Sequence, residues 1–258
     1  MKNIFGQAID KNGQKVGTEF VITDELRGDV YSSYMTELEG ASKFVIAYTG
    51  AYVDREDTQQ LKEEFQEVNF VDYHVKPGHV GIAGLIFDHS AAYSTATPAK
   101  YGKNFQITEN HFGGNVVIGD IKSLSPEKFV VVWQYSAQDF NTDGHFEEEK
   151  NGWSNYNPND PSIEFRIFTV LPRNDISNVF GGPQTTVDAG PSVYVSNPKL
   201  SIAENGKFIV WWQQKSQPDV VSCHKENIYE TIYDGTSSDN IPSIVKAKNI
   251  VTDPGHSL

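Results

Sequence analysis

The stretch Lys128-Phe-Val-Val-Val-Trp-Gln134 decides the fold, because it is apolar on both faces and it recurs along the chain. Its counterparts are Lys43-Phe-Val-Ile-Ala-Tyr-Thr49 and Lys207-Phe-Ile-Val-Trp-Trp-Gln213. Neighbouring side chains of a strand point to opposite faces, so an apolar run on both faces indicates a strand that is covered on two sides. The repeated stretch therefore predicts sheets stacked face to face. Trp211 and Trp212, one on each face, are both expected to be core residues.

A second landmark shows that the chain is built from repeats. Four seven-residue apolar runs each begin with Ile: Ile4-Phe-Gly-Gln-Ala-Ile-Asp10, Ile82-Ala-Gly-Leu-Ile-Phe-Asp88, Ile163-Glu-Phe-Arg-Ile-Phe-Thr169 and Ile228-Tyr-Glu-Thr-Ile-Tyr-Asp234. Their starts divide the chain into units 4–81, 82–162, 163–227 and 228–258. A recurring, strand-rich unit of this size signals a modular β-architecture.

Each of the first three units predicts a succession of strands joined by short turns. The opening run is the first strand, and a short β-branched stretch such as Asn104–Thr108 is the second. A third strand precedes a turn, which at Asn205-Gly206 has the signature of a type I′ hairpin. The Phe-Val-Val-Val-Trp run is the fourth strand. Gln59–Val68, between units one and two, is the one stretch with helix-like apolar spacing.

The pattern predicts an all-β fold of stacked four-stranded antiparallel sheets that resembles a β-propeller. A β-sandwich and a linear array of small β-domains also cover both faces of a strand, and they remain alternatives. The fourth unit, 228–258, holds only the first two strands. We expect the chain to be an excerpt of a longer repeat protein. Completion of the half unit by a partner copy, or by pairing with the first unit to close a ring, would also explain it.

Composition and charge limit the partners. The formal net charge is −13, which argues against a nucleic-acid partner, because such proteins need clustered Lys and Arg. No apolar run approaches membrane-spanning length, so membrane insertion is not expected. The single cysteine permits no disulfide within the chain. Met1-Lys-Asn-Ile-Phe leads directly into the first strand without the apolar segment of a secretory signal.

One stretch has the spacing of a calcium loop. In Asp139-Phe-Asn141-Thr-Asp143-Gly144-His145-Phe-Glu147, oxygen-bearing side chains stand at positions one, three, five and nine, with Gly at six. This spacing lets a tight loop gather hard oxygen ligands around Ca²⁺, and the His145 carbonyl would add another. The pattern resembles the calcium loops of integrin-type propellers, with Glu147 in the last position. A solvated Asp/Asn/Gly turn is the alternative interpretation.

A second candidate lies in the insertion Trp153-Ser-Asn-Tyr156-Asn-Pro-Asn-Asp-Pro161. Trp153 and Tyr156 would serve to stack on a sugar ring or to anchor a protein partner. The alternative is an ordinary Pro/Asn loop whose Trp packs on the domain.

The repeat resembles a known family. Phe129-Val-Val-Val-Trp-Gln134, followed by Gln138-Asp139, and the Ile82–Asp88 opening are similar to the tandem repeats of very large bacterial surface and secreted proteins and of large ciliate proteins. Unit one departs from the pattern, with Tyr48-Thr49 in place of Trp-Gln. The resemblance implies a propeller-like scaffold in adhesion or extracellular assembly, in long arrays and without a known reaction.

No catalytic motif stands out. Asp10, Asp88 and Asp234 recur at the end of the opening run, which favours a turn-capping role over catalysis. We predict a non-catalytic binding or assembly module of a larger surface, adhesive or structural protein, extracellular or at the cell surface. Its partner is a protein, a glycan or further repeats of the same chain. The alternatives are a propeller-type glycoside hydrolase or lectin, and a cytoplasmic or ciliary structural protein if Met1 is the native start.

Overall fold

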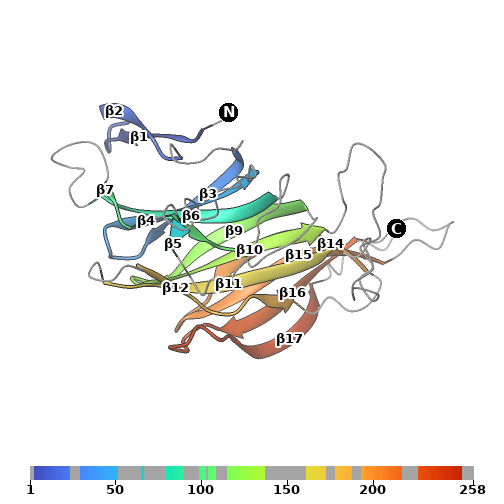
Figure 1. The fold of residues 1–258 in the computed structure, drawn as a ribbon. Helices are drawn as coiled ribbons and strands as arrows, with labels where there is room; N and C mark the ends of the chain where they lie inside the picture. The colour runs from blue at the N-terminus through green and yellow to red at the C-terminus, as the bar shows by residue number, and fades with distance from the viewer. Residues whose placement is uncertain are drawn as a thin grey trace, which may run out of the picture.

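A computed structural model shows that all regular secondary structure in the described part of the chain is β (Figure 1). The described residues are 3–23, 30–51, 65–66, 80–89, 99–102, 104–108, 115–136, 161–172, 178–187, 193–216 and 226–251. The predicted all-β fold, made of several antiparallel sheets, is confirmed. Within these residues no helix is long and apolar enough to cross a membrane.

The described strands form four sheets, which we call A to D in chain order. Sheet A is the hairpin of β1 (Phe5–Ile9) and β2 (Lys15–Val21). Sheet B has the order β3 (Val30–Leu38), β4 (Lys43–Ala51), β6 (Val80–Asp88), β8 (Asn104–Gln106), β5 (Phe65–Gln66), with β7 (Ala99–Lys100) beside β6. Sheet C has the order β9 (Asn115–Ser125), β10 (Lys128–Ser136), β11 (Ser162–Val170), β12 (Val179–Gly181), with β13 (Thr185–Val187) beside β11. Sheet D has the order β14 (Val193–Ile202), β15 (Lys207–Ser216), β16 (Glu226–Asp234), β17 (Ser243–Val251).

Each larger sheet combines strands from two successive sequence units. Sheet D, for example, takes β14 and β15 from unit 163–227 and β16 and β17 from unit 228–258. The third and fourth strands of one unit thus share a sheet with the first and second strands of the next unit. The direct pairing across the boundary is between the fourth strand and the following first strand. Because unit 228–258 was expected to hold only two strands, a half-built sheet was predicted near the C-terminal end. That expectation was wrong, because sheet D has four strands, and the two-stranded sheet is the hairpin β1–β2. The unit boundaries themselves remain a prediction.

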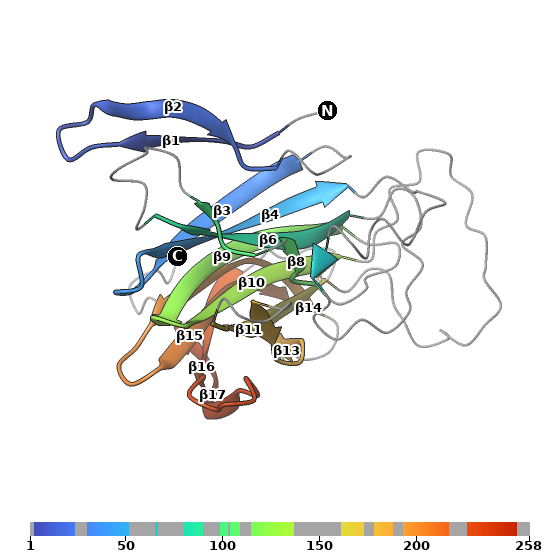
Figure 2. The same cartoon turned by 60° about the vertical axis from the view of Figure 1, so that its left-hand side comes forward.

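The sheets stack in chain order, with the hairpin at one end and sheet D at the other (Figures 1 and 2). Three separate apolar cores lie between hairpin A and sheet B, between B and C, and between C and D. The fourth strand of each unit, β4, β10 or β15, has the same orientation relative to these cores. Toward the preceding layer they present Phe44, Ile46 and Tyr48 of β4, Phe129, Val131 and Trp133 of β10, and Phe208, Val210 and Trp212 of β15.

Aromatic rings form the centre of each core. Between B and C, the rings of Phe129 and Phe168 are stacked with centroids 5.0 Å apart, and Phe105 of sheet B lies 6.0 Å from Phe129. Between C and D, Phe165 contacts Phe208 and Tyr233 at centroid distances of 5.3 and 4.7 Å. Offset and edge-to-face pairs of this kind add to the stabilisation from buried area. The two large cores therefore fix the sheets against one another.

The connection between the first and second strands of one unit contacts the equivalent connection of the next unit, and a glycine lies at each of these contacts. A Cβ on Gly102 would lie 2.1 Å from Nδ2 of Asn178 in sheet C, and Gly102 also has a positive φ of 84°. A Cβ on Gly182 would lie 2.3 Å from the carbonyl oxygen of Asn240 in sheet D. Because real Cβ atoms do not approach so closely, each glycine leaves room for an asparagine of the next layer.

Hydrogen bonds tie sheets C and D together at the same end. Asn240 is buried, its Nδ2 donates to the Phe180 carbonyl at 3.1 Å, and its Oδ1 accepts from Thr169 Oγ1 at 2.9 Å. Lys128 Nζ donates to the carbonyls of Ser237 and Gly235. Partial burial lowers the pKa of Lys128, an effect that the nearby Asp239 carboxylate opposes.

Two local expectations from the sequence had different outcomes. Asn205 and Gly206 have φ values of 60° and 72°, so the predicted hairpin turn between β14 and β15 is confirmed. The helix-like interpretation of Gln59–Val68 was wrong at Phe65–Gln66, which form β5 and pair in parallel with β8. A short parallel pairing made across a long connection leaves no local periodicity to detect.

Candidate interaction surfaces and a buried polar cluster

The predicted ligand sites fall on residues that the structure does not describe. Asp139, Asn141, Asp143, His145 and Glu147 all lie between β10 and β11, as do Trp153 and Tyr156. Among the described residues, no group of three or more His, Cys, Asp or Glu side chains is placed to hold a metal. The calcium loop and the aromatic loop therefore stay predictions from the sequence.

Sheet D ends the stack, and no further layer of the described residues covers its largely apolar outer face. Its strand β16 turns Tyr229, Thr231 and Tyr233 toward sheet C, so the intervening side chains point outward. The outward set is Ile209 and Trp211 of β15 and Ile228, Glu230 and Ile232 of β16, with Glu230 opposite Trp211, and we call it the outer face of sheet D. Ile228 is 46% exposed, and the register places Ile209 opposite Ile232. The corresponding positions of sheets B and C are buried by the next layer.

Polar contacts also lie on this face. Trp211 Nε1 donates to Ser201 Oγ at 3.0 Å, and Lys246 Nζ lies 3.5 Å from Glu230 Oε1. Trp212 is buried between C and D as expected, but Trp211 is only half-buried. The expectation that both are core residues was wrong for Trp211, because the described residues include no layer beyond sheet D.

Hairpin A ends the stack on the other side and exposes both a face and an edge. Phe5 and Ile9 are each 54% exposed, and Val21, which lies opposite Phe5, is 37% exposed. Strand β1 pairs with β2 on one edge, and no described strand pairs with its other edge. An open edge with an apolar face is a template for another strand.

Asp10 and Asp234, two of the three recurring aspartates, cap turns, as predicted. Asp10 Oδ1 accepts hydrogen bonds from the backbone N–H groups of Asn12 and Gln14, both at 2.8 Å. Asp234 Oδ1 accepts from the hydroxyl of Thr236 at 2.7 Å and from its backbone N–H at 2.9 Å. These bonds favour the charged carboxylate and lower its pKa, chiefly through Gln14 N–H for Asp10 and through the Thr236 hydroxyl for Asp234.

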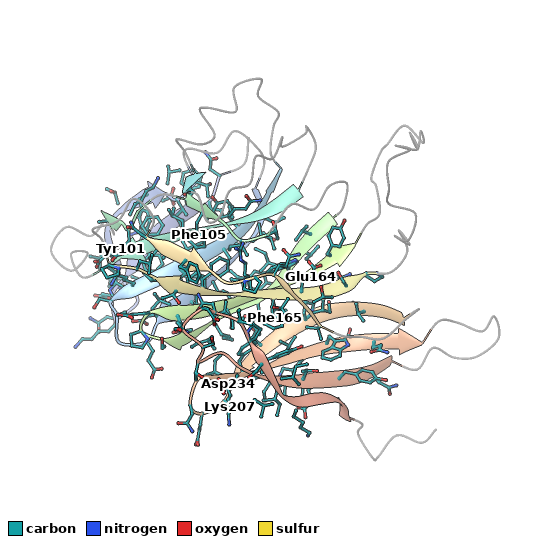
Figure 3. The ribbon with its side chains drawn as sticks, turned by 60° about the horizontal axis from the view of Figure 1, so that its bottom comes forward. Tyr101, Phe105, Glu164, Phe165, Lys207 and Asp234 are labelled. Atoms are coloured by element: carbon teal, nitrogen blue, oxygen red, sulfur yellow. The ribbon has the colours of Figure 1, made fainter. Side chains whose placement is uncertain are left out.

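A buried carboxylate lies between sheets B and C. Glu164 of β11 is 6% exposed, and its Oε2 accepts from Trp133 Nε1 at 2.9 Å and from Gln184 Nε2 at 3.1 Å. Ser162 Oγ contacts Oε1 at 3.3 Å. Figure 3 shows Glu164 within the stack, beside Phe165. Among the described residues Glu164 is the one buried carboxylate.

Arg166 is the second buried charge of the same strand. Its Nε donates to the Gly182 carbonyl, and its Nη1 donates to the Ile107 carbonyl of sheet B at 3.3 Å. The guanidinium also lies 5.3 Å from the centroid of the Phe168 ring. Arg166 therefore links two sheets as well as filling space.

This polar cluster was not predicted from the sequence, although the sequence contains a signal for it. In the opening run of unit three, Glu164 and Arg166 stand at alternate positions between apolar residues. Alternation places both charges on one face of the strand. The hydrogen-bond partners from other strands are set by tertiary packing.

Replacing Trp133 by Phe should destabilise the protein by about 1–3 kcal/mol, because Glu164 then loses a donor in a buried site. Trp211→Phe is the matched control and should cost less than about 0.5 kcal/mol, since its bond to Ser201 is exposed. Urea unfolding followed by circular dichroism measures both. Equal losses in the two variants would contradict a stabilising role for the buried bond.

Asp234→Asn should lower the melting temperature at neutral pH but not in strong acid. A carboxylate with a depressed folded-state pKa stabilises the fold above its unfolded pKa, and this contribution is lost as pH falls through the folded pKa. The difference between the two proteins should therefore shrink between about pH 5 and pH 2. Thr236→Val should show a smaller pH-dependent loss, because the backbone N–H still donates. A difference that stays constant with pH argues against the cap.

No protein-family model matches the chain, and no curated protein matches it significantly. The resemblance to bacterial and ciliate repeats stays an expectation from the quoted motifs.

Proposed function

We propose that this chain is a non-catalytic assembly module, in which sheets of one repeat type are added face to face. The observation that carries the proposal is that the fourth strands have the same orientation in every layer, with one face toward the preceding layer and the other toward the next. Positions equivalent to Ile209 and Trp211 are Val45 and Ala47 in sheet B and Val130 and Val132 in sheet C. Those four side chains are fully buried by the next layer, whereas sheet D presents Ile209 and Trp211 outward.

The chemistry of the uncovered face indicates its partner. Ile209, Trp211, Ile228 and Ile232 make most of this face apolar, and Glu230 among them is paired with Lys246. Such a face suits another β-layer, which supplies flat aliphatic surface and polar groups. The partner is therefore a further sheet of the same kind, from another repeat or another copy. Contacts that use two different faces of one molecule extend a stack or close it into a ring, according to the rotation between layers. A propeller-like arrangement is the closed form of this proposal.

Association through sheet D is tested by substitution of Ile228. The parent chain should form larger species as concentration rises, and Ile228→Lys should shift it toward monomer, because a charge then occupies the contact. Sedimentation velocity over a range of concentrations measures this. The control is Val117→Lys, which puts the same charge on an edge strand of sheet C at a position 47% exposed. A parent chain that remains monomeric, or two variants with the same effect, would overturn the proposal.

We also propose that Ca²⁺ stabilises the connection between β10 and β11, on the basis of the Asp139–Glu147 spacing alone. Added Ca²⁺ should raise the melting temperature of the parent chain, and EDTA should reverse the increase. At calcium concentrations a hundredfold above the dissociation constant, the gain is about 2.7 kcal/mol. Asp139→Ala should abolish the response. A calcium effect of the same size in this variant would place the ion elsewhere. A role at the cell surface or outside the cell would fit a calcium-stabilised assembly module.

A further inference from the structure

The first strand of a unit is paired on both edges in every larger sheet. Strand β6 lies between β4 and β8, and β16 lies between β15 and β17. One neighbour is thus the second strand of the same unit, and the other is the fourth strand of the preceding unit. Strand β11 follows the same rule, with β10 on one edge and β12 and β13 on the other.

Strand β1 uses the same edge for its second strand as β6 does. The Ile4 N–H donates to Thr23 Oγ1 at 2.9 Å, and the equivalent Ile82 N–H donates to Thr108 Oγ1 at 3.2 Å. The Ile4 carbonyl accepts from Ile22 N–H at 2.8 Å, as the Ile82 carbonyl accepts from Ile107 N–H at 2.9 Å. Bonding alternates along a strand, so the backbone groups of Phe5 point to the open edge.

The hydrogen bonds at the C-terminal end of β1 also show which backbone groups point to the open edge. The Asp10 N–H donates to the Gln14 carbonyl at 2.9 Å, within the hairpin. Ile9, one residue earlier, therefore directs its backbone groups to the open edge. Ile9 is the counterpart of Phe87 and Tyr233, which lie opposite Phe44 and Phe208 of the fourth strands.

The strand registers also indicate which charged residue a strand at the open edge would place opposite Asp10. Lys43 lies opposite Asp88, and Lys207 lies opposite Asp234. Figure 3 shows Lys207 beside Asp234, and this lysine helps to lower the pKa of that carboxyl. Asp10 is the third aspartate at this position, and no described strand lies along its open edge.

From these registers we infer that the open edge of β1 is a binding site for a β-hairpin of the third- and fourth-strand type, supplied by a repeat of the same kind on another polypeptide. The fourth strand of that hairpin pairs antiparallel with β1, its lysine opposite Asp10 and its phenylalanine opposite Ile9. Backbone hydrogen bonds supply the affinity, and the alternate side chains supply the specificity, as in other strand additions. The inference deepens the proposed assembly function by naming a partner for the end of the stack opposite sheet D.

A peptide with the sequence of the β14–β15 hairpin, residues 193–216, provides the probe. Val193 and Ser216 lie opposite each other in that hairpin, so a disulfide between cysteines added at the two ends will preserve its register. Dye-labelled peptide is titrated into the full chain and followed by fluorescence anisotropy. Hydrogen exchange of the full chain is measured with and without saturating peptide. Saturable binding with slower exchange at the Phe5 and Ile9 amides is expected, whereas a cyclic peptide of scrambled sequence should give neither.

A charge exchange tests the register. Asp10→Lys in the chain should weaken peptide binding about two- to fivefold, the range for an exposed ion pair. A peptide carrying Lys207→Asp should recover the loss with that variant and bind the parent chain more weakly. Asp10→Asn is the folding control, because its amide oxygen still accepts the turn bonds from Asn12 and Gln14.

Three results would overturn the inference: no binding of the cyclic hairpin, binding without protection of the two amides, or no recovery on charge exchange. The Ile228→Lys variant separates this site from the outer face of sheet D. It should lose self-association through sheet D while binding the peptide with unchanged affinity. Loss of peptide binding with self-association intact would remove the β1 site alone.

Discussion

The burial of both faces of the Phe-Val-Val-Val-Trp strands is the constraint on which the rest of the structure depends. A strand such as β10, with Trp133 on one face and Val132 on the other, is stable only when layers lie on both sides of it. Sheets B and C meet this requirement from within the chain. Hairpin A covers sheet B with two strands, and among the described residues sheet D has a neighbouring layer on one face only. The ends of the stack are thus determined by the pattern that forms its middle.

Much of the fold could be predicted from the sequence because alternation along a strand is a local property. The apolar runs at Ile82–Asp88 and Lys128–Gln134 are strands, and the Asn205-Gly206 turn has the expected conformation. The grouping of strands into sheets could not be predicted in the same way. Lys207–Gln213 pairs with Ile228–Asp234 of the following unit, and such a register depends on contacts between segments that local patterns do not describe.

The candidate sites show the same division. Asp10 and Asp234 cap turns as their recurrence predicted, because a cap involves residues a few positions apart. Glu164 and Arg166 became partners of Trp133, Gly182 and Ile107, which come from other strands and from the neighbouring sheet. A buried ion is tolerated only where such partners surround it, and their identity is a property of the folded chain.

Each larger sheet contains strands from two successive predicted units, and this arrangement has a mechanical consequence. In a string of independent domains, tension unfolds one domain at a time. Here the backbone hydrogen bonds between β10 and β11 of sheet C join residues on both sides of the predicted boundary at 162–163. Pulling one unit away shears the hydrogen bonds of its neighbour, so units resist tension jointly. For the same reason, a fragment that ends at a predicted unit boundary contains only half of one sheet. A fragment that ends between β13 and β14 contains only complete sheets.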